Sequence, residues 1–430
     1  IGVVGVKLVS PGKKLQQIGY VLGLGDEGIA SSPLMGKSMD DKGYMNQAML
    51  VREVSAVSGA CLMLSKQLYD QTKGLNEAFD VRFGDIDLCL RVKDLAYKIL
   101  WTPYVTLIHH GEKSFKEDEK SKAIILEQWL PQLANDKYYN RNLSLKEADF
   151  HADNSLNCAW NVDFNDKPKV YAFPGDSFGV GQYRVRAPLN ALTKQGVIES
   201  SFANNVDDLV YPTVTEMERI SPNVLVSQNS FLDTSLTPWK QYRKYNNTFM
   251  VSGLDDLVYM LPQYHPKQGK WPSNVRRKVK ELFQNSDRVI VANEALAEEF
   301  RKMADDLVVV PNYLENWRWD SLSLPNKNKS KKLRVGWAGG QEHIADLEFI
   351  RPVIEALHKE VDWIFMGLCL EGFEPYIKEA YAGVEFDRYP QMLANLNLDL
   401  AIAPLMHNKF NECKTNLRLL EYGILGWPVV

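Results

Sequence analysis

Two carboxylates, Asp85 and Asp87, precede a run of apolar residues that recur with helical spacing. Both therefore lie at the N-terminal end of an expected helix. A carboxylate beside a hydroxyl-bearing substrate can take its proton as a general base. An acidic residue at a helix start can equally stabilise the helix by about 1 kcal/mol without any catalysis. The spacing alone leaves both roles of Asp85 open, and Asp87 is expected to be the cap or a partner of the reacting residue.

Two histidines, His109 and His110, end an apolar strand expected over 99–108. Alternation along a strand turns one of them inward and the other outward. An imidazole can bind a metal, but a metal site of this kind needs carboxylate partners as well. The alternative is a histidine that is satisfied by hydrogen bonds or exposed to water.

A pair of glycines, Gly339 and Gly340, lies between an expected strand over 333–337 and an expected helix over 346–359. Residues without side chains let backbone N–H groups approach a phosphate, which a helix N-terminus also favours. His343 follows three residues later and strengthens the indication. A simple turn is the alternative.

Four residues surround the start of the last expected helix, namely Lys414, Asn416, Leu417 and Glu421. Lys414 could neutralise a bound anion, and the N–H groups near Asn416 and Leu417 could bind it. The Glu421 carboxylate could accept hydrogen bonds from hydroxyl groups. A surface carboxylate is the alternative for Glu421.

A third group could contact an acceptor or a diphosphate. Gly181 gives a flexible turn to the loop that carries Arg184 and Arg186, and these cations could bind an anion. A solvated loop is equally open. Asp255 and Asp256 end an apolar strand and could contact an acceptor, or could simply form a turn.

The elements that must position these residues change character along the chain. Residues 1–115 alternate short strands with one helix, whereas 116–167 form a polar connector with a helix over 124–139 that is broken at Pro131. From residue 168 onward strands alternate with helices, which predicts a largely parallel sheet. The expected strands cover 170–173, 224–227, 248–253, 289–292, 307–310, 333–337, 363–366 and 398–403. The expected helices cover 187–195, 276–284, 294–303, 346–359 and 416–424, and a polar linker lies at 324–332.

The composition is that of a globular protein, with 45% apolar and 24% charged residues among 430, enough for two or three domains. The net charge of −4 gives no basic footprint for nucleic acid. No apolar run approaches the roughly 18 residues of a membrane span, and no secretory signal is found. Five widely spaced cysteines indicate reduced thiols in a cytoplasmic protein. The apolar ends, IGVVGVKLV and WPVV, indicate a fragment of a longer protein.

The pieces SGACLML, GLNEAF, GDIDLCLR and IHHGEKS carry a resemblance. With them, residues 1–115 resemble the C-terminal half of an inverting family 2 glycosyltransferase of the GT-A fold. The resemblance implies that Asp85 is the general base and that His109 helps to hold a donor-bound divalent metal, Mg or Mn. It departs from the family at Gly84, where a Glu is usual.

The pieces GWAGGQEHIADLE and KTNLRLLEYGILGWPVV, with weaker support from VVVPNYLE and VSGLDDLVY, carry a second resemblance. Residues 168–430 resemble a family 4 glycosyltransferase of the GT-B fold, which implies a retaining enzyme without a metal or other cofactor. Glu421 matches the second Glu of that family's paired-glutamate signature, which holds the donor ribose. Cys413 occupies the position of the first.

Together the resemblances predict an α/β protein with a partial GT-A domain at 1–115, a connector at 116–167 and a GT-B pair of Rossmann-like domains. The pair comprises an acceptor-side domain at 168–325 and an incomplete donor-side domain at 333–430. The implied activity is that of a bifunctional, hexosyltransferase-type enzyme. It would transfer sugars from nucleotide-diphosphate donors to a glycan or lipid-linked glycan acceptor in polysaccharide or glycoconjugate biosynthesis.

Three expectations remain beside this one. The basic run at 276–280 could make peripheral contact with the inner face of a membrane, with a solvated helix face as the alternative. A non-catalytic glycan- or nucleotide-binding scaffold is favoured by Gly84 and Cys413. A sugar-nucleotide epimerase of the same GT-B architecture would change a sugar without adding an acceptor.

Overall fold

The computed structural model describes residues 1–80, 82–111, 118–147, 150–153, 158, 160, 166–203, 210–326 and 331–430. Within these ranges the chain forms two compact units. The first unit takes residues 1–165, 210–222 and 240–248, and the second takes 166–209, 223–239 and 249–430. Ser114 and parts of the connector and of the linker at 324–332 lie outside the described residues.

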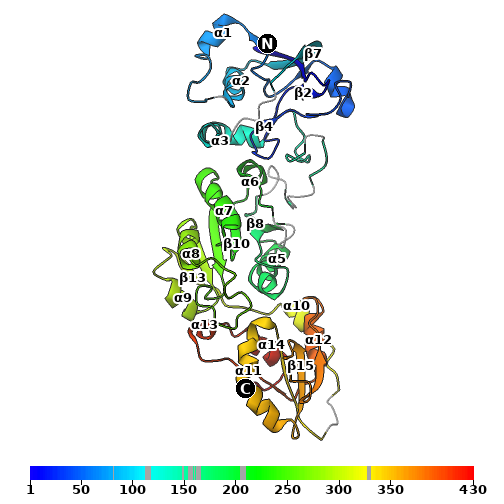
Figure 1. Cartoon of the computed structure of the whole chain (residues 1–430), viewed down its shortest axis with the longest axis vertical. Coiled ribbons are helices and arrows are strands. Elements are labelled where there is room, and N and C mark those ends of the chain that lie inside the picture. The colour runs from blue at the N-terminus through cyan, green and yellow to red at the C-terminus, as the bar shows by residue number, and fades with distance from the viewer. Residues whose placement is uncertain are drawn as a thin grey trace. The chain divides into compact units, whose positions relative to one another are not determined.

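A five-stranded mixed sheet forms the centre of the first unit (Figure 1). Its strands are β1 (Val3–Val9), β2 (Leu15–Gln17), β5 (Arg52–Glu53), β6 (Leu62–Leu64) and β7 (Ile99–Ile108). β1 and β7 pair in parallel, whereas β2 and β6 pair with β1, and β5 with β7, in antiparallel fashion. A separate pair consists of β3 (Val21–Leu22) and β4 (Ala30–Ser31). The helices are η1 (Tyr44–Met49), α1 (Lys66–Gln71), α2 (Gly84–Asp94), α3 (Glu119–Ala134) and α6 (Val214–Ile220).

Asp87 links α2 to α3 in the core of the first unit. Its side chain is buried and accepts hydrogen bonds from the Trp129 indole N–H at 2.9 Å and from Arg91 Nε at 2.9 Å. Arg91 in turn donates to the carbonyls of Thr72 and Gly74. Because both carboxylate oxygens of Asp87 have donors, this acid holds the fold together.

Helix α3 differs from the helix expected over 124–139. It begins after Asp118, whose carboxylate accepts a hydrogen bond from the Ser121 N–H at 2.9 Å. Pro131 lies inside the last turn and does not break the helix. One backbone hydrogen bond is lost there, and burial of apolar residues such as Leu133 outweighs that loss.

Helix α6 was not predicted from the apolar pattern. It begins with a capping box in which Thr213 and Glu216 each bond the other's backbone N–H. The Thr-x-x-Glu spacing is visible in the sequence and is the signal that would have found this helix.

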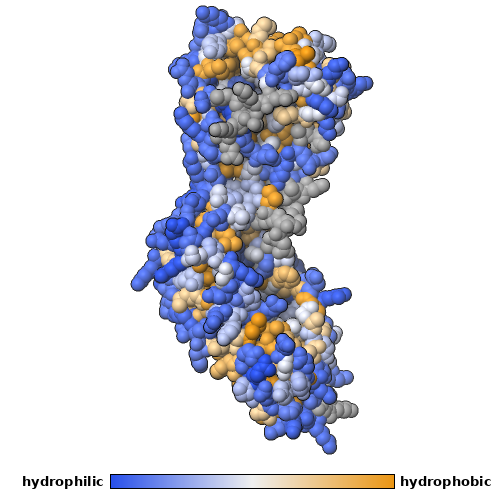
Figure 2. Space-filling view, viewed as in Figure 1, coloured by the Kyte–Doolittle hydropathy of each residue, from blue (hydrophilic) through white to orange (hydrophobic). Residues whose placement is uncertain are grey.

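The strand expected over 99–108 is confirmed as β7, but only its first half belongs to the core. Residues from Tyr104 to Ile108 are exposed, and Tyr104 is 83% exposed. Figure 2 shows apolar residues gathered over the end of the first unit that carries β7. The second half of β7 therefore exposes apolar side chains to water.

A six-stranded, fully parallel sheet begins the second unit. Its strands are β8 (Lys169–Phe173), β9 (Glu199–Phe202), β10 (Val224–Gln228), β11 (Phe249–Leu254), β12 (Arg288–Val291) and β13 (Leu307–Val309). The spatial order β13-β12-β11-β10-β8-β9 reverses between β8 and β10. The helices are α4 (Gly179–Gly181), η2 (Gln182–Arg186), α5 (Ala187–Lys194), α7 (Asp233–Tyr245), α8 (Val275–Gln284) and α9 (Glu294–Phe300). Residues of α7 from 240 onward count with the first unit.

A second parallel sheet, the C-terminal sheet, follows in the same unit. Its strands are β14 (Arg334–Gly339), β15 (Asp362–Gly367), β16 (Ile377–Tyr381) and β17 (Leu400–Ala401), in the order β16-β15-β14-β17. Val429 forms a parallel bridge with Ala401, as expected of the last apolar segment. The helices are α10 (Asn316–Trp319), η3 (Gln341–His343), α11 (Ile344–Leu357), α12 (Tyr389–Asn395), α13 (Lys409–Glu412) and α14 (Leu417–Ile424).

Helices cover both faces of the C-terminal sheet. Trp337 packs with Leu347 and Ile354 of α11 on one face, whereas Ala338 packs with Tyr422 of α14 on the other. Helices α11 and α12 flank β15 in Figure 1. Burial on both faces explains why these strands are continuous apolar runs.

The predicted α/β class is confirmed, with parallel sheets in the second unit. The strands β9 (ESSF) and β16 (IKEAY) are not predicted from the sequence, because these edge strands are half polar and lack an apolar run. The assignment of the parts to GT-A and GT-B folds stays a prediction, as do the domain boundaries. Among the described residues no helix is both long enough and apolar enough to cross a membrane.

A buried ion pair fixes the start of β14. Arg334 is buried and binds Glu379 through two N–H···O bonds of 2.8 Å. These bonds, with a further one from Tyr381, lower the pKa of Glu379 to about 2. The pair therefore stabilises the fold above the ordinary pKa of 4.5, and this contribution is lost as the pH falls through about 2.

We predict that Glu379→Gln lowers the free energy of unfolding by about 2 kcal/mol at pH 7, because it leaves a buried guanidinium without its charge partner. The difference from the parent chain should shrink as the pH approaches 2. Denaturant titrations at pH 7 and at pH 2.5 measure both values, with the exposed Glu360→Gln as the matched control. An equal difference at the two pH values would contradict this account of the pair.

Candidate functional site

The C-terminal sheet reverses its strand order between the neighbours β14 and β17. Open α/β sheets bind ligands outside the carboxyl ends of the strands at such a point, because the connections leave to opposite faces there. β14 ends at Gly339, and the chain after β17 leads through α13 into α14. We name the residues around these ends the switch-point cluster: Gly339, Gly340, Glu342, His343, Asp346, Asn411, Lys414 and Arg418.

Gly339 lies where a side chain has no room. A Cβ atom there would be 2.5 Å from the Trp337 ring and 2.6 Å from the Arg418 guanidinium. A Cβ on Gly340 would lie 2.6 Å from the Glu342 carboxylate, which is the mobile end of a side chain. Gly339 is therefore required by the packing of Trp337 and Arg418, and the Glu342 carboxylate lies beside Gly340.

His343 is buried and forms a hydrogen-bonded group with two residues that the sequence analysis did not name. Its Nδ1 lies 2.7 Å from a carboxylate oxygen of Asp346, whose other oxygen accepts from the Met406 N–H and the Asn411 amide, both at 2.9 Å. This group connects the start of α11 to the segment after β17. The His-x-x-Asp spacing on a helix start could have indicated the pair.

Burial decides the charge state of His343. Burial lowers the pKa of His343, although the bond to Asp346 works in the opposite direction. Burial alone would raise the pKa of Asp346, but its hydrogen bonds from His343 and Met406 lower it below the ordinary value. At neutral pH the pair is therefore a neutral imidazole that donates from Nδ1 to a carboxylate.

Two cations lie in the switch-point cluster. Arg418 lies over the Trp337 ring at 5.3 Å, and Lys414 Nζ lies 4.9 Å from the centre of the Phe410 ring. Burial alone would raise the pKa of Glu342, but its own backbone N–H and the nearby positive charges, including Lys414 and Arg418, lower it. Both cations can reach an anion at this point of the sheet, and Arg418 was missed in the sequence analysis.

The backbone that carries Lys414 is held in place by asparagines. The Asn293 amide donates to the carbonyls of Cys413 and Lys414 at 2.8 and 3.1 Å. The Asn312 amide donates to the Thr415 hydroxyl at 3.1 Å. The position of the lysine is therefore set by hydrogen bonds rather than by packing alone.

Helix α14 begins with an open N-terminus. Asn416 is its first flanking residue and makes no side-chain capping bond, and Leu417 is the first helical residue. The N–H groups of the first turn are donors without partners inside the helix. They could bind an anion, as the sequence analysis expected, and this role stays a prediction.

Glu421 is buried and already has two partners. Its carboxylate oxygens accept from the Tyr183 hydroxyl at 2.8 Å and from the Tyr389 hydroxyl at 2.9 Å. Burial raises the pKa of Glu421, which these bonds partly oppose. Next to it, the Tyr422 hydroxyl accepts a hydrogen bond of 3.0 Å from the Ala338 N–H and so fixes α14 to β14. A ribose at Glu421 would have to replace a tyrosine hydroxyl.

The loop after β8 is folded tightly around Asp176. A Cβ on Gly181 would lie 2.0 Å from the Asp176 carbonyl oxygen, so this position requires glycine. The Asp176 carboxylate accepts from the N–H groups of Gly181 and Phe178 at 2.8 and 3.0 Å. Gly181 is therefore required for this compact turn.

The two arginines of this loop, Arg184 and Arg186, contact different parts of the second unit. Arg184 donates to the Val310 carbonyl at 2.5 Å and to the Asn312 side chain at 2.9 Å. Arg186 instead lies over the Phe202 ring at 5.0 Å. Arg184 therefore lies next to the asparagine that supports Thr415, whereas Arg186 packs on the edge strand β9.

Asp255 follows β11 and has an oxygen available to a ligand. Its Oδ1 is buried without a hydrogen-bond partner among the described residues, and the same holds for Oδ1 of Asn229 after β10. Asn229 also has a left-handed φ of 56°, a conformation that is found at functional sites. Burial, followed by the charge of Asp256, raises the pKa of Asp255 to about 6. Asn229 follows β10, beside the point where the first sheet of the second unit reverses its order, and Asp255 follows the neighbouring β11. Both oxygens can accept hydrogen bonds from hydroxyl groups.

Asp85 lies in the first turn of α2, but it is not the cap. The residue before the helix is Phe83, which has a left-handed φ of 69°. The Asp85 carboxylate accepts from the Gly59 N–H at 2.8 Å and from the Ile86 N–H at 2.9 Å. Burial raises the pKa of Asp85, as suits a general base. Its catalytic role stays a prediction, and the expectation that Asp87 caps the helix is wrong.

His109 contacts the side chain of Gln16. Its Nδ1 lies 3.2 Å from the Gln16 side-chain oxygen, and His110 is exposed. Among the residues that the structure describes, no group of three His, Cys, Asp or Glu could hold a metal ion. The expected role of His109 at an Mg or Mn site stays a prediction.

No protein-family model matches the chain. Over 160 residues it is 36% identical to the uncharacterized protein y4gI of Sinorhizobium fredii, which covers 35% of this chain and 17% of that protein. Over 161 residues it is 29% identical to the O-antigen biosynthesis protein RfbC of Myxococcus xanthus, which covers 35% of this chain and 12% of that protein. The chain thus spans less than a fifth of the length of either relative.

Two solved structures share a distant likeness. The apo form of the lipopolysaccharide outer core galactosyltransferase WaaB matches with a TM-score of 0.39 and 11% identity, over 61% of this chain and 79% of that chain. The sucrose-phosphate synthase of Thermosynechococcus elongatus matches with a TM-score of 0.41 and 12% identity, over 61% and 80%. At these scores the likeness does not establish a common fold.

The raised pKa of Asp255 gives a pH-dependent prediction. Protonation of Asp255 favours the folded state. This contribution to the free energy of unfolding is complete below the ordinary pKa of 3.8 and is lost as the pH rises through about 6. Asp255→Asn stays neutral, so it should raise the free energy of unfolding by about 2 kcal/mol at pH 8 and change little at pH 4.

Urea titrations of the parent and variant chains across pH 4–8 measure this difference. The exposed Asp320→Asn is the control and should show no such trend. A difference that is larger at pH 4 than at pH 8 would refute the assigned burial of Asp255.

Proposed function

We propose that this chain is part of a glycosyltransferase that moves a sugar from a nucleotide-diphosphate donor to a glycan acceptor during the assembly of a bacterial surface polysaccharide. The observation that carries the proposal is the switch-point cluster. It combines a glycine pair between strand and helix, two cations and an open helix N-terminus at the carboxyl end of a parallel sheet. This combination suits a diphosphate.

In the proposed reaction the donor diphosphate lies against Gly339 and Gly340. Lys414 and Arg418 stabilise the negative charge that grows on the diphosphate as the bond to the sugar breaks. The neutral His343, oriented by Asp346, keeps its Nε2 available as a hydrogen-bond acceptor for the donor.

The acceptor hydroxyl would bind at the other reversal point of the second unit. The free oxygens of Asp255 and Asn229 accept hydrogen bonds, which matches the hydroxyl groups of a sugar. Arg184 lies near enough for its charge to act on Asp255. In this arrangement Asp255 positions the acceptor while the departing diphosphate remains on the cations.

The similarity to the Myxococcus RfbC, whose name refers to O-antigen biosynthesis, supports a role in polysaccharide assembly. The finer parts of the proposal are a second, GT-A-like module in the first unit with Asp85 as its base, and a lipid-linked acceptor at the cytoplasmic membrane face. The raised pKa of Asp85 supports the first of these.

A second candidate function is a glycan- or nucleotide-binding scaffold without catalysis. Two observations favour it: Glu421 is engaged by Tyr183 and Tyr389, and Cys413 replaces an expected Glu. A scaffold would bind a nucleoside diphosphate without releasing one from a nucleotide sugar.

We predict that Lys414→Ala reduces the release of nucleoside diphosphate from nucleotide sugars at least tenfold, because the leaving group loses a positive charge. The assay incubates the full chain with a panel of nucleotide sugars and glycan acceptors and measures the released nucleotide. Lys359→Ala, which removes an exposed lysine after α11, should leave release unchanged.

Calorimetric titration with nucleoside diphosphates separates the two candidate functions. Binding that depends on Lys414, without any release, would establish the scaffold and exclude the transferase. Release that is equal in the parent chain and in Lys414→Ala would refute the assignment of the diphosphate to this cluster.

A further inference from the structure

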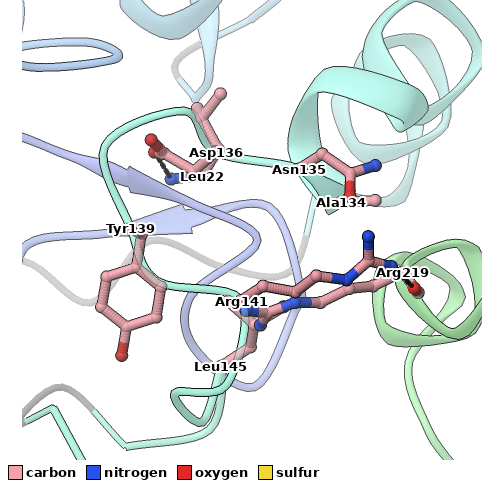
Figure 3. A pocket seen from close by; sticks show the side chains of 8 residues that line it. All are labelled: Leu22, Ala134, Asn135, Asp136, Tyr139, Arg141, Leu145 and Arg219. Carbon is pink, nitrogen blue, oxygen red and sulfur yellow. Dashed lines mark hydrogen bonds between the residues drawn. The ribbon is translucent and has the colours of Figure 1, made fainter. Parts of the chain in front are cut away.

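The first unit contains a cavity that plays no part in the proposed function. Its volume is about 170 Å³, several times the roughly 30 Å³ that a water molecule takes up in the liquid. Residues from β3, the end of α3, the segment after α3 and α6 line it, as Figure 3 shows. The lining includes the side chains of Asn135, Asp136, Arg141 and Arg219.

Two guanidinium groups lie beside each other along one wall of this cavity (Figure 3). Arg219 is only 6% exposed, whereas Arg141 is exposed. Arg219 donates to the carbonyls of Leu143 and Asn140, both at 3.1 Å, and Arg141 donates to the Arg219 carbonyl at 2.5 Å. The backbone bonds of Arg219 fix its guanidinium in place without neutralising it.

Neither guanidinium forms an ion pair with a described residue. Within the described part of the chain, no carboxylate oxygen lies within 4.0 Å of Arg141 or Arg219. Burial lowers the pKa of Arg219; the charge of Asp153 opposes this, and that of Arg141 adds to it. Two like charges at a partly buried site are unfavourable unless an anion joins them.

Asp136, on the opposite wall of the cavity, already has hydrogen-bond donors on both carboxylate oxygens. One oxygen of Asp136 accepts from the Leu22 N–H at 2.7 Å, and the other accepts from the Ser55 hydroxyl and the Tyr138 N–H, both at 2.8 Å. Its charge also acts on Arg52 and Lys93. Asp136 is thus occupied by other donors, and the negative charges that act on Arg219 come from Asp153 and Glu216 without a direct ion pair among the described residues.

The donors that remain point to the kind of ligand. Each guanidinium has five N–H donors, and with the described residues the two arginines together form three hydrogen bonds. A planar fork of donors matches the oxygens of a tetrahedral or carboxylate anion better than any neutral group does. The Asn135 side chain lies at the rim of the same cavity.

We propose that the cavity between α3 and α6 binds a small oxyanion, a phosphate or carboxylate group, through the paired guanidiniums of Arg141 and Arg219. The site is separate from the switch-point cluster and does not depend on the proposed function.

Isothermal titration calorimetry of the full chain with inorganic phosphate tests this inference. We expect saturable binding that Arg141→Gln weakens at least tenfold, since one fork and one charge are removed. Arg288→Gln, which removes an exposed arginine of the second unit that pairs with Asp306, should bind phosphate as the parent does. Acetate in place of phosphate tells which oxyanion the site prefers.

Arg141→Lys keeps the positive charge but loses the planar pair of guanidinium donors. It replaces Arg141→Gln as the test variant if Arg141→Gln has a lowered melting temperature. It should also bind phosphate more weakly than the parent. The inference is overturned if the parent chain binds neither anion saturably, or if the Arg141 variants bind as tightly as the parent.

Discussion

The strand order of the two parallel sheets in the second unit constrains where a ligand can bind. In each sheet the order in which the chain adds strands reverses once. The reversal lies between β8 and β10 in the first sheet and between β14 and β17 in the C-terminal sheet. Helices cover the faces of the C-terminal sheet, so polar side chains can gather only at the strand ends. The polar group around His343 lies at the second of these points, and Asn229 and Asp255 follow β10 and the neighbouring β11 beside the first. The bond from Ala338 to Tyr422 then holds α14, and with it Arg418, against the end of β14.

Five buried or partly buried carboxylates of this protein differ in their hydrogen-bond partners. Asp87, Asp136, Asp346 and Glu421 each have donors on both oxygens, and they join segments that are distant in sequence. Asp255 differs because one of its buried oxygens has no partner among the described residues. An unpaired buried oxygen costs free energy, and a site that binds hydroxyl groups gives a reason to keep it. Among the described residues Glu216 also has a buried oxygen without a hydrogen-bond partner, but its other oxygen accepts from the Thr213 N–H in the capping box of α6.

Much of the fold was predictable from the sequence, because buried parallel strands are apolar runs and their helices repeat every three to four residues. The edge strands β9 and β16 and the helix α6 were missed, since their signals are polar or lie in a capping box. Spacing could place Gly339 and Lys414 near a common strand end. It could not reveal the partners of Glu421, because Tyr183 lies 238 residues away and approaches only through the tertiary fold. Nor could it show that His109 would bond to Gln16.

Hydrogen–deuterium exchange of the full chain, with and without a panel of nucleoside diphosphates, tests the central claim most directly. If the switch-point cluster binds the diphosphate, at least one nucleotide should slow exchange over residues 338–346 and 406–421. The first turn of α14 should respond most, because its N–H groups have no partners inside the helix. Slowed exchange confined to the first unit, or no change with any nucleotide, would contradict the account.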